Sequence, residues 1–248
     1  MPRVRTGESV VARVVRVLEA FTTDEPALSV TEIARRSALP VATASRLIAE
    51  LAAHGLLVRS EGAVRVGVRM WELAQRASPT LSLREAAMPF LEDLHAVIGQ
   101  HVQLGVLDGD EVLFVERMSA PNAVINYTRI AGRLDLHASA SGIVLLAHAP
   151  AEQQERVLAA PLRRFTARTP TRPGQVREML ADVRRQGYAL CAGFYHLDAT
   201  GVAVPVRDGS GAVVAALGAV VPNDGNAYLH VPALMAAARG IARVLASH

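Results

Sequence analysis

The sequence predicts an α+β protein, with a small helical part in front of a larger part that mixes strands and helices. Residues 1–79 show short amphipathic helical patterns, whereas strand and helix patterns interleave from residue 80 onward. Asp108-Gly109-Asp110 separates two alternating apolar runs, and Asp-Gly accommodates the positive φ of a tight hairpin turn. Strand pairs with flanking helices indicate a domain built around one antiparallel sheet.

The first predicted element is an amphipathic helix that ends near Phe21. Apolar residues recur along it at helical spacing and are expected to support the elements that follow. They are Val11, Val14, Leu18 and Phe21, with Val10, Val15 and Val17 widening the apolar face. Asp24-Glu25-Pro26 is expected to form the turn after this helix.

Residues 29–59 have the layout of a helix-turn-helix. Ser29 can cap a first helix, and Glu32 three residues later completes a capping box. Pro40 suits the start of the next helix, because proline disfavours helical geometry in the residue before it. The second helix ends at Gly55. Its predicted buried face consists of Ala44, Leu47, Ile48 and Leu51.

Two short strands are predicted at residues 56–59 and 64–66, around a turn at residues 60–63. This hairpin would be the wing of a winged helix-turn-helix domain at residues 1–65. The beginning of the second helix meets base edges when such a helix lies in a major groove, and Arg59 and Arg65 of the wing would meet phosphates. The DNA-contact candidates are Thr31, Arg35, Val41, Ala42, Thr43, Ser45, Arg46, Arg59 and Arg65. A small helical bundle with no role in DNA binding is the alternative.

Charge and composition narrow the function classes. All 26 basic residues are arginine, which excludes enzymes that need a Schiff-base or P-loop lysine. Residues 1–78 carry 11 arginines against 8 acidic residues, whereas residues 79–248 carry 15 of each. The excess of positive charge belongs to the front part, which fits contact with phosphates.

The cysteine count and the hydropathy of the chain indicate in which cellular compartment the protein lies. Cys191 is the only cysteine, so the chain has neither an intramolecular disulfide nor a cysteine cluster for zinc. There is no run of roughly eighteen apolar residues, and the first ten residues have no apolar signal core. We therefore expect a cytoplasmic protein without a membrane partner.

Residues 66–79 are predicted to form a linker helix that Ser78-Pro79 ends, and the domain boundary is expected there. Its apolar residues are Met70, Trp71, Leu73 and Ala74. An exposed Trp71 would indicate contact with a second subunit. Packing of Trp71 on the first helix is the alternative.

Residues 80–248 are expected to form one domain of alternating elements. The predicted helices lie at residues 81–98, 141–147, 151–159, 173–186 and 229–246. The predicted strands lie at residues 101–107, 111–117, 123–129, 188–192, 202–207 and 212–221. In the first of these helices, Leu91, Leu94, Val97 and Ile98 are expected to face inward.

The turn at residues 137–142 is the best candidate for a ligand site in this domain. It leads into a helix, and the first free N–H groups of a helix can hold a carboxylate without a cationic side chain. The alternative is that Ser139 or Ser141 only caps that helix, and one turn can do both.

A hydrolase is the competing interpretation, because Asp135, His137, Ser139 and Ser141 lie within seven residues. However, neither serine lies in the Gly-x-Ser-x-Gly turn that exposes a nucleophile. The histidines at positions 95, 101 and 196 also lack a third ligand at a recognised metal spacing. No catalytic residue, metal or cofactor is therefore predicted.

Several ordered segments resemble IclR-family transcriptional regulators. The clearest is residues 32–51, EIARRSALPVATASRLIAEL, followed by residues 66–77, VGVRMWELAQRA, and residues 134–147, LDLHASASGIVLLA. The resemblance covers nearly the whole chain, and FTARTPTRP, RRQGYAL and GVAVPVRDGSGAVVAALGAV follow in the family's order. It implies that residues 80–248 form a GAF-like effector-binding domain. It also implies a homodimer or pair of dimers that binds a double-stranded DNA operator and responds to a small organic acid.

In regulators that resemble this chain, small acids bind at the turn before the helix and on the last three strands. Carried over, the effector site would consist of His137, Ala140, Ser141, Cys191, Gly201, Gly218 and Val220, with Met118, Tyr127 and Tyr195 as walls. Cys191, Gly218 and Val220 replace acidic residues or serines that are common in the family. These replacements remove hydrogen-bonding groups and side-chain volume, so we expect a roomier, more apolar pocket that takes an aromatic or medium-length carboxylate.

Overall fold

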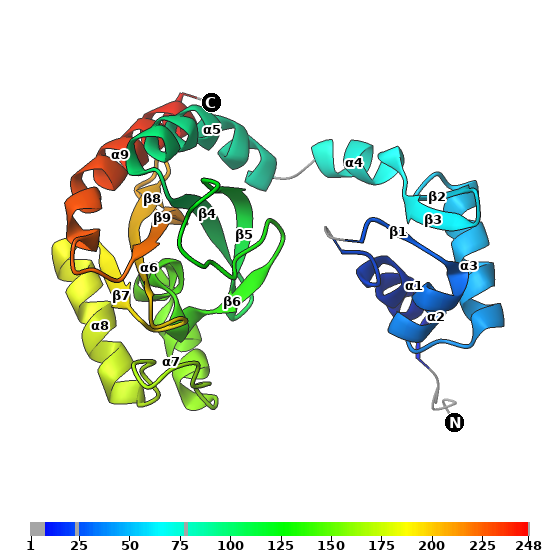
Figure 1. Ribbon diagram of the computed structural model, residues 1–248, viewed down its shortest axis with the longest axis horizontal. Helices are drawn as coiled ribbons and strands as arrows, with labels where there is room; N and C mark the ends of the chain where they lie inside the picture. Colours follow the sequence, from blue (N-terminus) through cyan, green and yellow to red (C-terminus); the bar gives the residue numbers. More distant parts are fainter. Residues whose placement is uncertain (1–7, 23–24, 77–78, 248) are drawn as a thin grey trace. The chain divides into compact units, whose positions relative to one another are not determined.

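The computed structural model describes residues 8–22, 25–76 and 79–247. The chain divides into two compact units, Met1–Ser78 and Pro79–His248. Figure 1 labels the helices and strands of both units. Helices and strands occur in both, as the predicted α+β class requires.

The front unit contains the predicted helix-turn-helix. Its helices are α1 (Val10–Glu19), α2 (Val30–Arg36) and α3 (Val41–Ala53). Ser29 caps α2, because its hydroxyl accepts a hydrogen bond from the N–H of Glu32 over 3.1 Å. Ala38 has a φ of 50° in the turn, and Pro40 precedes α3 directly. The predicted turn at Asp24-Glu25-Pro26 lies partly outside the described residues.

The predicted capping box forms only in part. The side chain of Glu32 accepts hydrogen bonds from Arg35 and Arg36, and no hydrogen bond from the N–H of Ser29 to it is seen in the described residues. Two guanidinium groups within reach attract the carboxylate more strongly than one backbone N–H does.

A small antiparallel sheet and a further helix complete the front unit. The strands are β1 (Ala27–Leu28), β2 (Leu57–Ser60) and β3 (Ala63–Val66), in the order β1-β3-β2. The hairpin of β2 and β3 confirms the predicted wing, whereas β1 has only two residues and is too short to show periodicity. Helix α4 (Val68–Gln75) follows, and the predicted end of this helix at Ser78 lies outside the described residues.

Fewer apolar residues of α1 are buried in the core of the front unit than their helical spacing predicts. Val17 is fully buried against α2 and α3, and Val14, Leu18 and Phe21 pack around the core. The prediction is wrong for Val11, which is 71% exposed, and for Val10 and Val15, which are also exposed. A single helix buries one stripe against its own unit, so valines beyond that stripe stay in contact with solvent.

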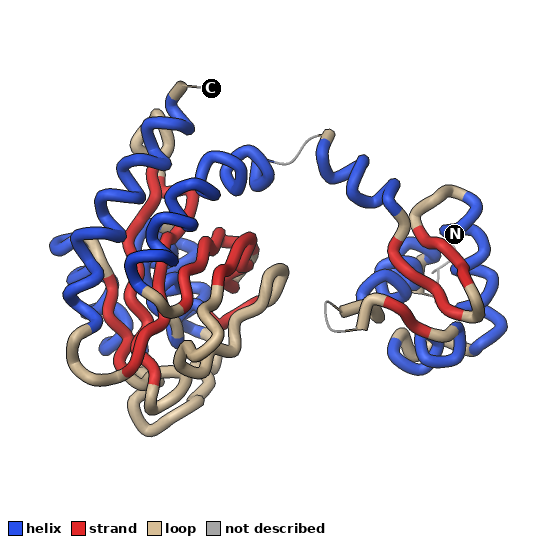
Figure 2. The backbone as a smooth tube through the Cα atoms, turned by 45° about the horizontal axis from the view of Figure 1, so that its top comes forward, coloured by secondary structure: helices blue, strands red, loops and turns tan. Residues whose placement is uncertain are grey.

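The rear unit is built on a six-stranded antiparallel sheet in the order β6-β5-β4-β9-β8-β7, drawn in red in Figure 2. The strands are β4 (His101–Asp108), β5 (Glu111–Met118), β6 (Arg133–Asp135), β7 (Ala189–Ala192), β8 (Ala199–Arg207) and β9 (Val213–Pro222). The Asp108-Gly109-Asp110 hairpin is confirmed, since β4 pairs directly with β5.

Helices cover both faces of this sheet. Helices α5 (Pro79–Ile98) and α9 (Val231–Ala246) pack together on one face. The other face carries α6 (Ala140–His148), α7 (Ala151–Ala159) and α8 (Pro173–Gln186). The short 3-10 turns η1 (Leu136–Ala138) and η2 (Ala227–His230) precede α6 and α9. Apolar side chains of the strands alternate between these two cores.

The predicted strand at residues 123–129 is wrong, because this segment has no regular structure and the third strand is β6. Side chains take up its backbone groups instead of a neighbouring strand. The N–H of Val124 donates to the Gln100 side chain over 2.9 Å, and the Arg117 guanidinium donates to the carbonyl of Thr128.

Two further differences concern burial and strand length. Val97 was expected to face inward but is 75% exposed, because α5 turns only Leu91, Leu94 and Ile98 to the sheet at its end. β8 begins at Ala199, three residues before the predicted start.

One helical stretch, Ala227–Ala246, is long and apolar enough to span a membrane by length and composition. Leu234, Ala238 and Ile241 of this stretch are buried in the core that it shares with α5 and the sheet. Packing inside the rear unit therefore accounts for its apolar composition.

Candidate nucleic-acid interface and ligand cavity

Helix α3 turns a face of small residues and one arginine to solvent. Its buried side consists of Ala44, Leu47, Ile48 and Leu51. With 3.6 residues per turn, Ala42, Arg46 and Ala49 lie on the opposite side, and all three are exposed. Val41 is also exposed, whereas Thr43 and Ser45 are half-buried on the flanks. Small side chains around one long cationic side chain allow close approach to a groove of DNA.

Exposed arginines lie both on this face of α3 and on the wing. Arg46 and Arg65 are exposed, and neither forms an ion pair with another described residue. Arg59 of β2 donates to the carbonyl oxygen of Ser45 over 3.0 Å, which ties the wing to α3. Uncompensated guanidinium groups next to an exposed helix suit contact with phosphates.

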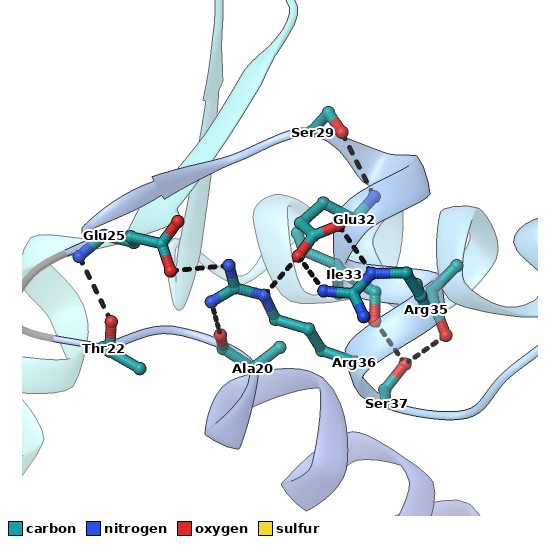
Figure 3. A network of polar contacts seen from close by, with 10 residues as sticks. Ala20, Thr22, Glu25, Ser29, Glu32, Ile33, Arg35, Arg36 and Ser37 are labelled. Carbon is teal, nitrogen blue, oxygen red and sulfur yellow. Dashed lines mark hydrogen bonds and ion pairs between the residues drawn. The ribbon is translucent and has the colours of Figure 1, made fainter.

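A network of polar contacts at α2 involves two arginines, Arg35 and Arg36, which have different roles (Figure 3). Arg36 donates to Glu25 and Glu32 over 2.6 Å each and to the carbonyl oxygen of Ala20 over 3.2 Å. Arg36 therefore joins the end of α1 to α2. Arg35, a predicted DNA contact, is exposed but holds both oxygens of Glu32, which partly neutralises its charge. Thr31 is exposed at the start of α2.

The Glu32 network is expected to make the front unit sensitive to acid. Its hydrogen bonds to Arg35 and Arg36 lower the pKa of Glu32 from 4.5 to about 2. A lowered pKa contributes stability that is present above pH 4.5 and is lost as the pH falls towards about 2. Glu32→Gln should therefore flatten the fall of the melting temperature in this range, as followed by circular dichroism. Glu50→Gln, which removes an exposed carboxylate without an ion pair among the described residues, should retain the wild-type slope. Equal slopes for Glu32→Gln and wild type would contradict the prediction.

The rear unit contains a cavity of about 50 Å³ on the α6 face of the sheet. The start of α6 and two loops, at residues 125–128 and 195–199, surround it. Six of the predicted effector residues line it, namely Tyr127, Ala140, Cys191, Tyr195, Gly201 and Val220. The lining is mostly apolar.

The first turn of α6 supplies hydrogen-bond donors to this cavity. Ser139 caps the helix, because its hydroxyl accepts from the N–H of Gly142 over 3.1 Å. The N–H groups of Ala140 and Ser141 have no acceptor among the described residues. The positive end of the helix dipole and the N–H group of Ala140, which lines the cavity, can hold an anion here. The turn can therefore both cap the helix and bind a ligand.

Three strands form the floor of the cavity below this turn. Cys191 pairs with Gly201, and Gly201 pairs with Val220, so the three residues lie side by side. A Cβ atom on Gly201 would lie 3.3 Å from the Cβ of Ala140, so glycine lets α6 approach the sheet. Burial raises the pKa of the Cys191 thiol, which keeps the floor uncharged next to an anion.

Side chains of the sheet fix the loop that covers one end of the cavity. Arg117 donates to the hydroxyl of Ser119 over 2.8 Å, and that hydroxyl lies 3.0 Å from Nδ1 of His101. Ser119 therefore donates to Nδ1, and Nε2 of His101 donates to the carbonyl of Val124 over 2.5 Å. Burial lowers the pKa of His101, which favours this neutral form. These hydrogen bonds attach the loop to the sheet.

Aromatic side chains gather at the mouth of the cavity. The ring of Tyr195 stacks on that of Phe165 with 4.2 Å between the centroids. The ring of Tyr127 lies 5.7 Å from that of Tyr195 and 6.0 Å from the imidazole of His196. Tyr127 is 52% exposed. Such a cluster suits contact with a planar aromatic ligand.

Four predicted effector residues do not line the cavity. Met118 packs in the core on the opposite face, and Nε2 of His137 lies 2.8 Å from the carbonyl oxygen of Arg163. Ser141 and Gly218 lie behind the lining, where the buried Ser141 hydroxyl has no hydrogen-bond partner among the described residues and is 3.2 Å from the position of a Gly218 Cβ. The lining residues that were not predicted include Gln103, Ile125, Asn126, Thr128 and His196.

The hydrolase interpretation finds no support in this geometry. His137 bonds to the carbonyl of Arg163, Ser139 caps α6, and the buried Ser141 hydroxyl has no partner in the part of the chain that the structure describes. Within the part of the chain that the structure describes, no group of three His, Cys, Asp or Glu side chains could hold a metal ion.

Comparison with known proteins identifies both units. The model of the IclR helix-turn-helix domain matches residues 10–61, and the model of the bacterial transcriptional regulator IclR C-terminal domain matches residues 75–245. The HTH-type transcriptional regulator XynR of Escherichia coli is 31% identical over 84% of this chain and 83% of its own length. The HTH-type transcriptional regulator KdgR of Dickeya chrysanthemi is 26% identical over 97% and 81%.

A solved structure matches the fold and most of the chain. It is an IclR homologue from Microbacterium hydrocarbonoxydans complexed with 4-hydroxybenzoate, with 46% identity and a TM-score of 0.92, and the match covers 97% of this chain and 100% of that one. These relatives and families are transcriptional regulators and not enzymes. The chain therefore belongs to the IclR family of transcriptional regulators, with a DNA-binding helix-turn-helix domain and a C-terminal ligand-binding domain.

Proposed function

We propose that this regulator binds a double-stranded DNA operator as a cytoplasmic homo-oligomer and that an aromatic monocarboxylate controls this binding. The observation that carries the proposal is the cavity, where the N–H group of Ala140, which has no acceptor among the described residues, meets an apolar space with aromatic side chains at its mouth. A carboxylate would bind the start of α6, and the ring would lie between the floor and Tyr195. The relative from Microbacterium hydrocarbonoxydans, which binds 4-hydroxybenzoate, supports this class of effector.

The size of the cavity indicates how such a ligand enters. A volume of about 50 Å³ is small beside the roughly 150 Å³ cavity that accepts benzene in an engineered protein. The predicted extra room is thus not open in this structure. Tyr127 lies at the mouth and is half-exposed, so its outward rotation enlarges the space without disturbing the buried floor. We infer that Tyr127 moves aside when the acid enters.

Exposed apolar residues of the front unit support assembly into dimers or tetramers. Trp71 of α4 is 62% exposed, which argues against the alternative that it packs on α1. Val11 of α1 and Val68 of α4 are exposed as well. Exposed apolar side chains in such numbers mark protein contacts, and two recognition helices read more base pairs than one. The effector would favour one arrangement of the two recognition helices over another.

An electrophoretic mobility shift with the purified full chain tests this function. We expect the protein to retard the DNA upstream of its own operon. We also expect 4-hydroxybenzoate or benzoate to change this retardation at concentrations at which glyoxylate has no effect. The same samples in sedimentation experiments should contain dimers or tetramers. Failure to retard this DNA at any effector concentration would contradict regulation of its own operon, and a response to glyoxylate alone would contradict an aromatic effector.

A further inference from the structure

Gln103 is a buried polar side chain at the end of the cavity away from the floor residue Cys191. It lies in β4 between apolar neighbours, is only 5% exposed and lines the cavity. A buried amide that lacks hydrogen-bond partners destabilises a protein, so each of its polar groups requires a partner. The hydrogen-bond partners of its oxygen and nitrogen therefore show which of these atoms is free to bind a ligand.

The oxygen of the Gln103 amide faces two hydrogen-bond donors of the loop at residues 125–128. The Thr128 hydroxyl lies 2.8 Å from Oε1 and 2.9 Å from Oδ1 of Asn126, and Asn126 donates its side-chain N–H to Oε1 over 3.4 Å. Because the Asn126 donor faces Oε1, the amide oxygen points to the loop and the amide nitrogen points away from it. Nε2 has no acceptor among the described residues, and it is not completely buried. In a residue that lines the cavity, this nitrogen is open to the cavity.

The sheet separates Gln103 from the start of α6. Gln103 lies on β4 and Gly201, below Ala140, lies on β8, with β9 between them. Gln103 pairs with Gly218, two residues along β9 from Val220, which pairs with Gly201, so two strand spacings of about 4.8 Å and two residues of about 3.3 Å place them roughly 12 Å apart. A ligand that reaches both donors needs polar groups at its two opposite ends.

We propose that Gln103 determines effector specificity by donating a hydrogen bond from Nε2 to a second polar group of the ligand, opposite its carboxylate. This inference rests on the proposed function, because it assumes an acid bound at the start of α6. A benzoate with an oxygen substituent in the para position meets this requirement, since its two polar ends lie across the ring. Thr128 and Asn126 act as positioning residues that fix the amide.

Titration calorimetry with the full-length protein tests the inference with 4-hydroxybenzoate, benzoate and 4-methylbenzoate. The methyl group has nearly the size of the hydroxyl but accepts no hydrogen bond. Wild type should bind 4-hydroxybenzoate about 10- to 100-fold more tightly than 4-methylbenzoate, because the methyl leaves Nε2 without a partner. Gln103→Leu should abolish this preference and retain binding of 4-methylbenzoate.

A second variant and a matched control make each outcome decisive. Thr128→Val leaves Gln103 in place but frees its amide to rotate, so the preference should become weaker without disappearing. Gln100→Leu removes a hydrogen bond to the same loop outside the cavity lining and should keep the wild-type preference. Equal affinity of wild type for all three acids, or an unchanged preference in Gln103→Leu, would overturn the role of Gln103. Neither result would contradict the proposal that the effector is an aromatic acid. Binding of none of the three would instead overturn the proposed effector class.

Discussion

Arg46→Ala is expected to weaken binding to the specific operator by about 1–3 kcal/mol, or roughly 5- to 150-fold, with a much smaller effect on random DNA. Arg46 is the long cationic side chain on the side of α3 opposite its buried residues, and it forms no ion pair with another described residue. Its neighbours on that side, Ala42 and Ala49, are too short to replace it. A lost contact to a base edge costs affinity only where that base is present.

Competition binding with operator and random duplexes at several salt concentrations measures this effect. Alanine favours helix, so the exposed substitution should leave α3 folded. Arg65→Ala is the matched control, because Arg65 lies on the wing and is expected to contact phosphate. It should weaken binding to both duplexes alike and reduce the salt dependence, as loss of one phosphate contact does. If Arg46→Ala also weakens both duplexes equally, Arg46 contacts phosphate and does not read bases.

The front unit could be predicted in detail because its signals are local. Ser29, Pro40 and Gly55 act on the residues beside them, so the start and end of each helix follow from adjacent sequence. Burial of α1 depends on the rest of the unit, and there the pattern failed, since Val11 carries the periodicity of a buried residue and remains exposed. A helical period shows which residues share a face, but it does not show how wide the covering surface is.

The rear unit could be predicted less well wherever distant residues decide the structure. Residues 123–129 alternate like a strand, yet side chains from β4 and β5 hold this backbone as a loop. Local alternation cannot reveal such partners. The same limit applies to the cavity, because Gln103 reaches it only through the register of β4 with β9. One sequence signal for Gln103 does exist, namely a polar residue at an inward position of an apolar strand.

Val220→Phe is expected to weaken the effector response strongly while operator binding is retained. Val220 is half-buried on β9, pairs with Gly201 and His101, and lines the cavity. A phenyl ring at this position would occupy the space proposed for the ring of the acid. Forcing extra volume into a packed site costs about 1–3 kcal/mol, so effector affinity should fall roughly 5- to 150-fold. Calorimetry and mobility shifts with 4-hydroxybenzoate measure the two effects separately.

Val220 is a better position for this test than Ser141. Ser141 is buried behind the lining beside Gly218, so a bulky residue there would strain the packing of α6 on the sheet and disturb folding. Val213→Phe is the matched control, because Val213 is half-buried on the same strand but outside the cavity lining. It should bind effector and operator as wild type does. If Val220→Phe binds 4-hydroxybenzoate normally, the acid does not occupy this cavity. If Val220→Phe loses operator binding as well, the site must instead be blocked by a substitution in the half-exposed loop at Tyr127, which lies farther from the core of the sheet.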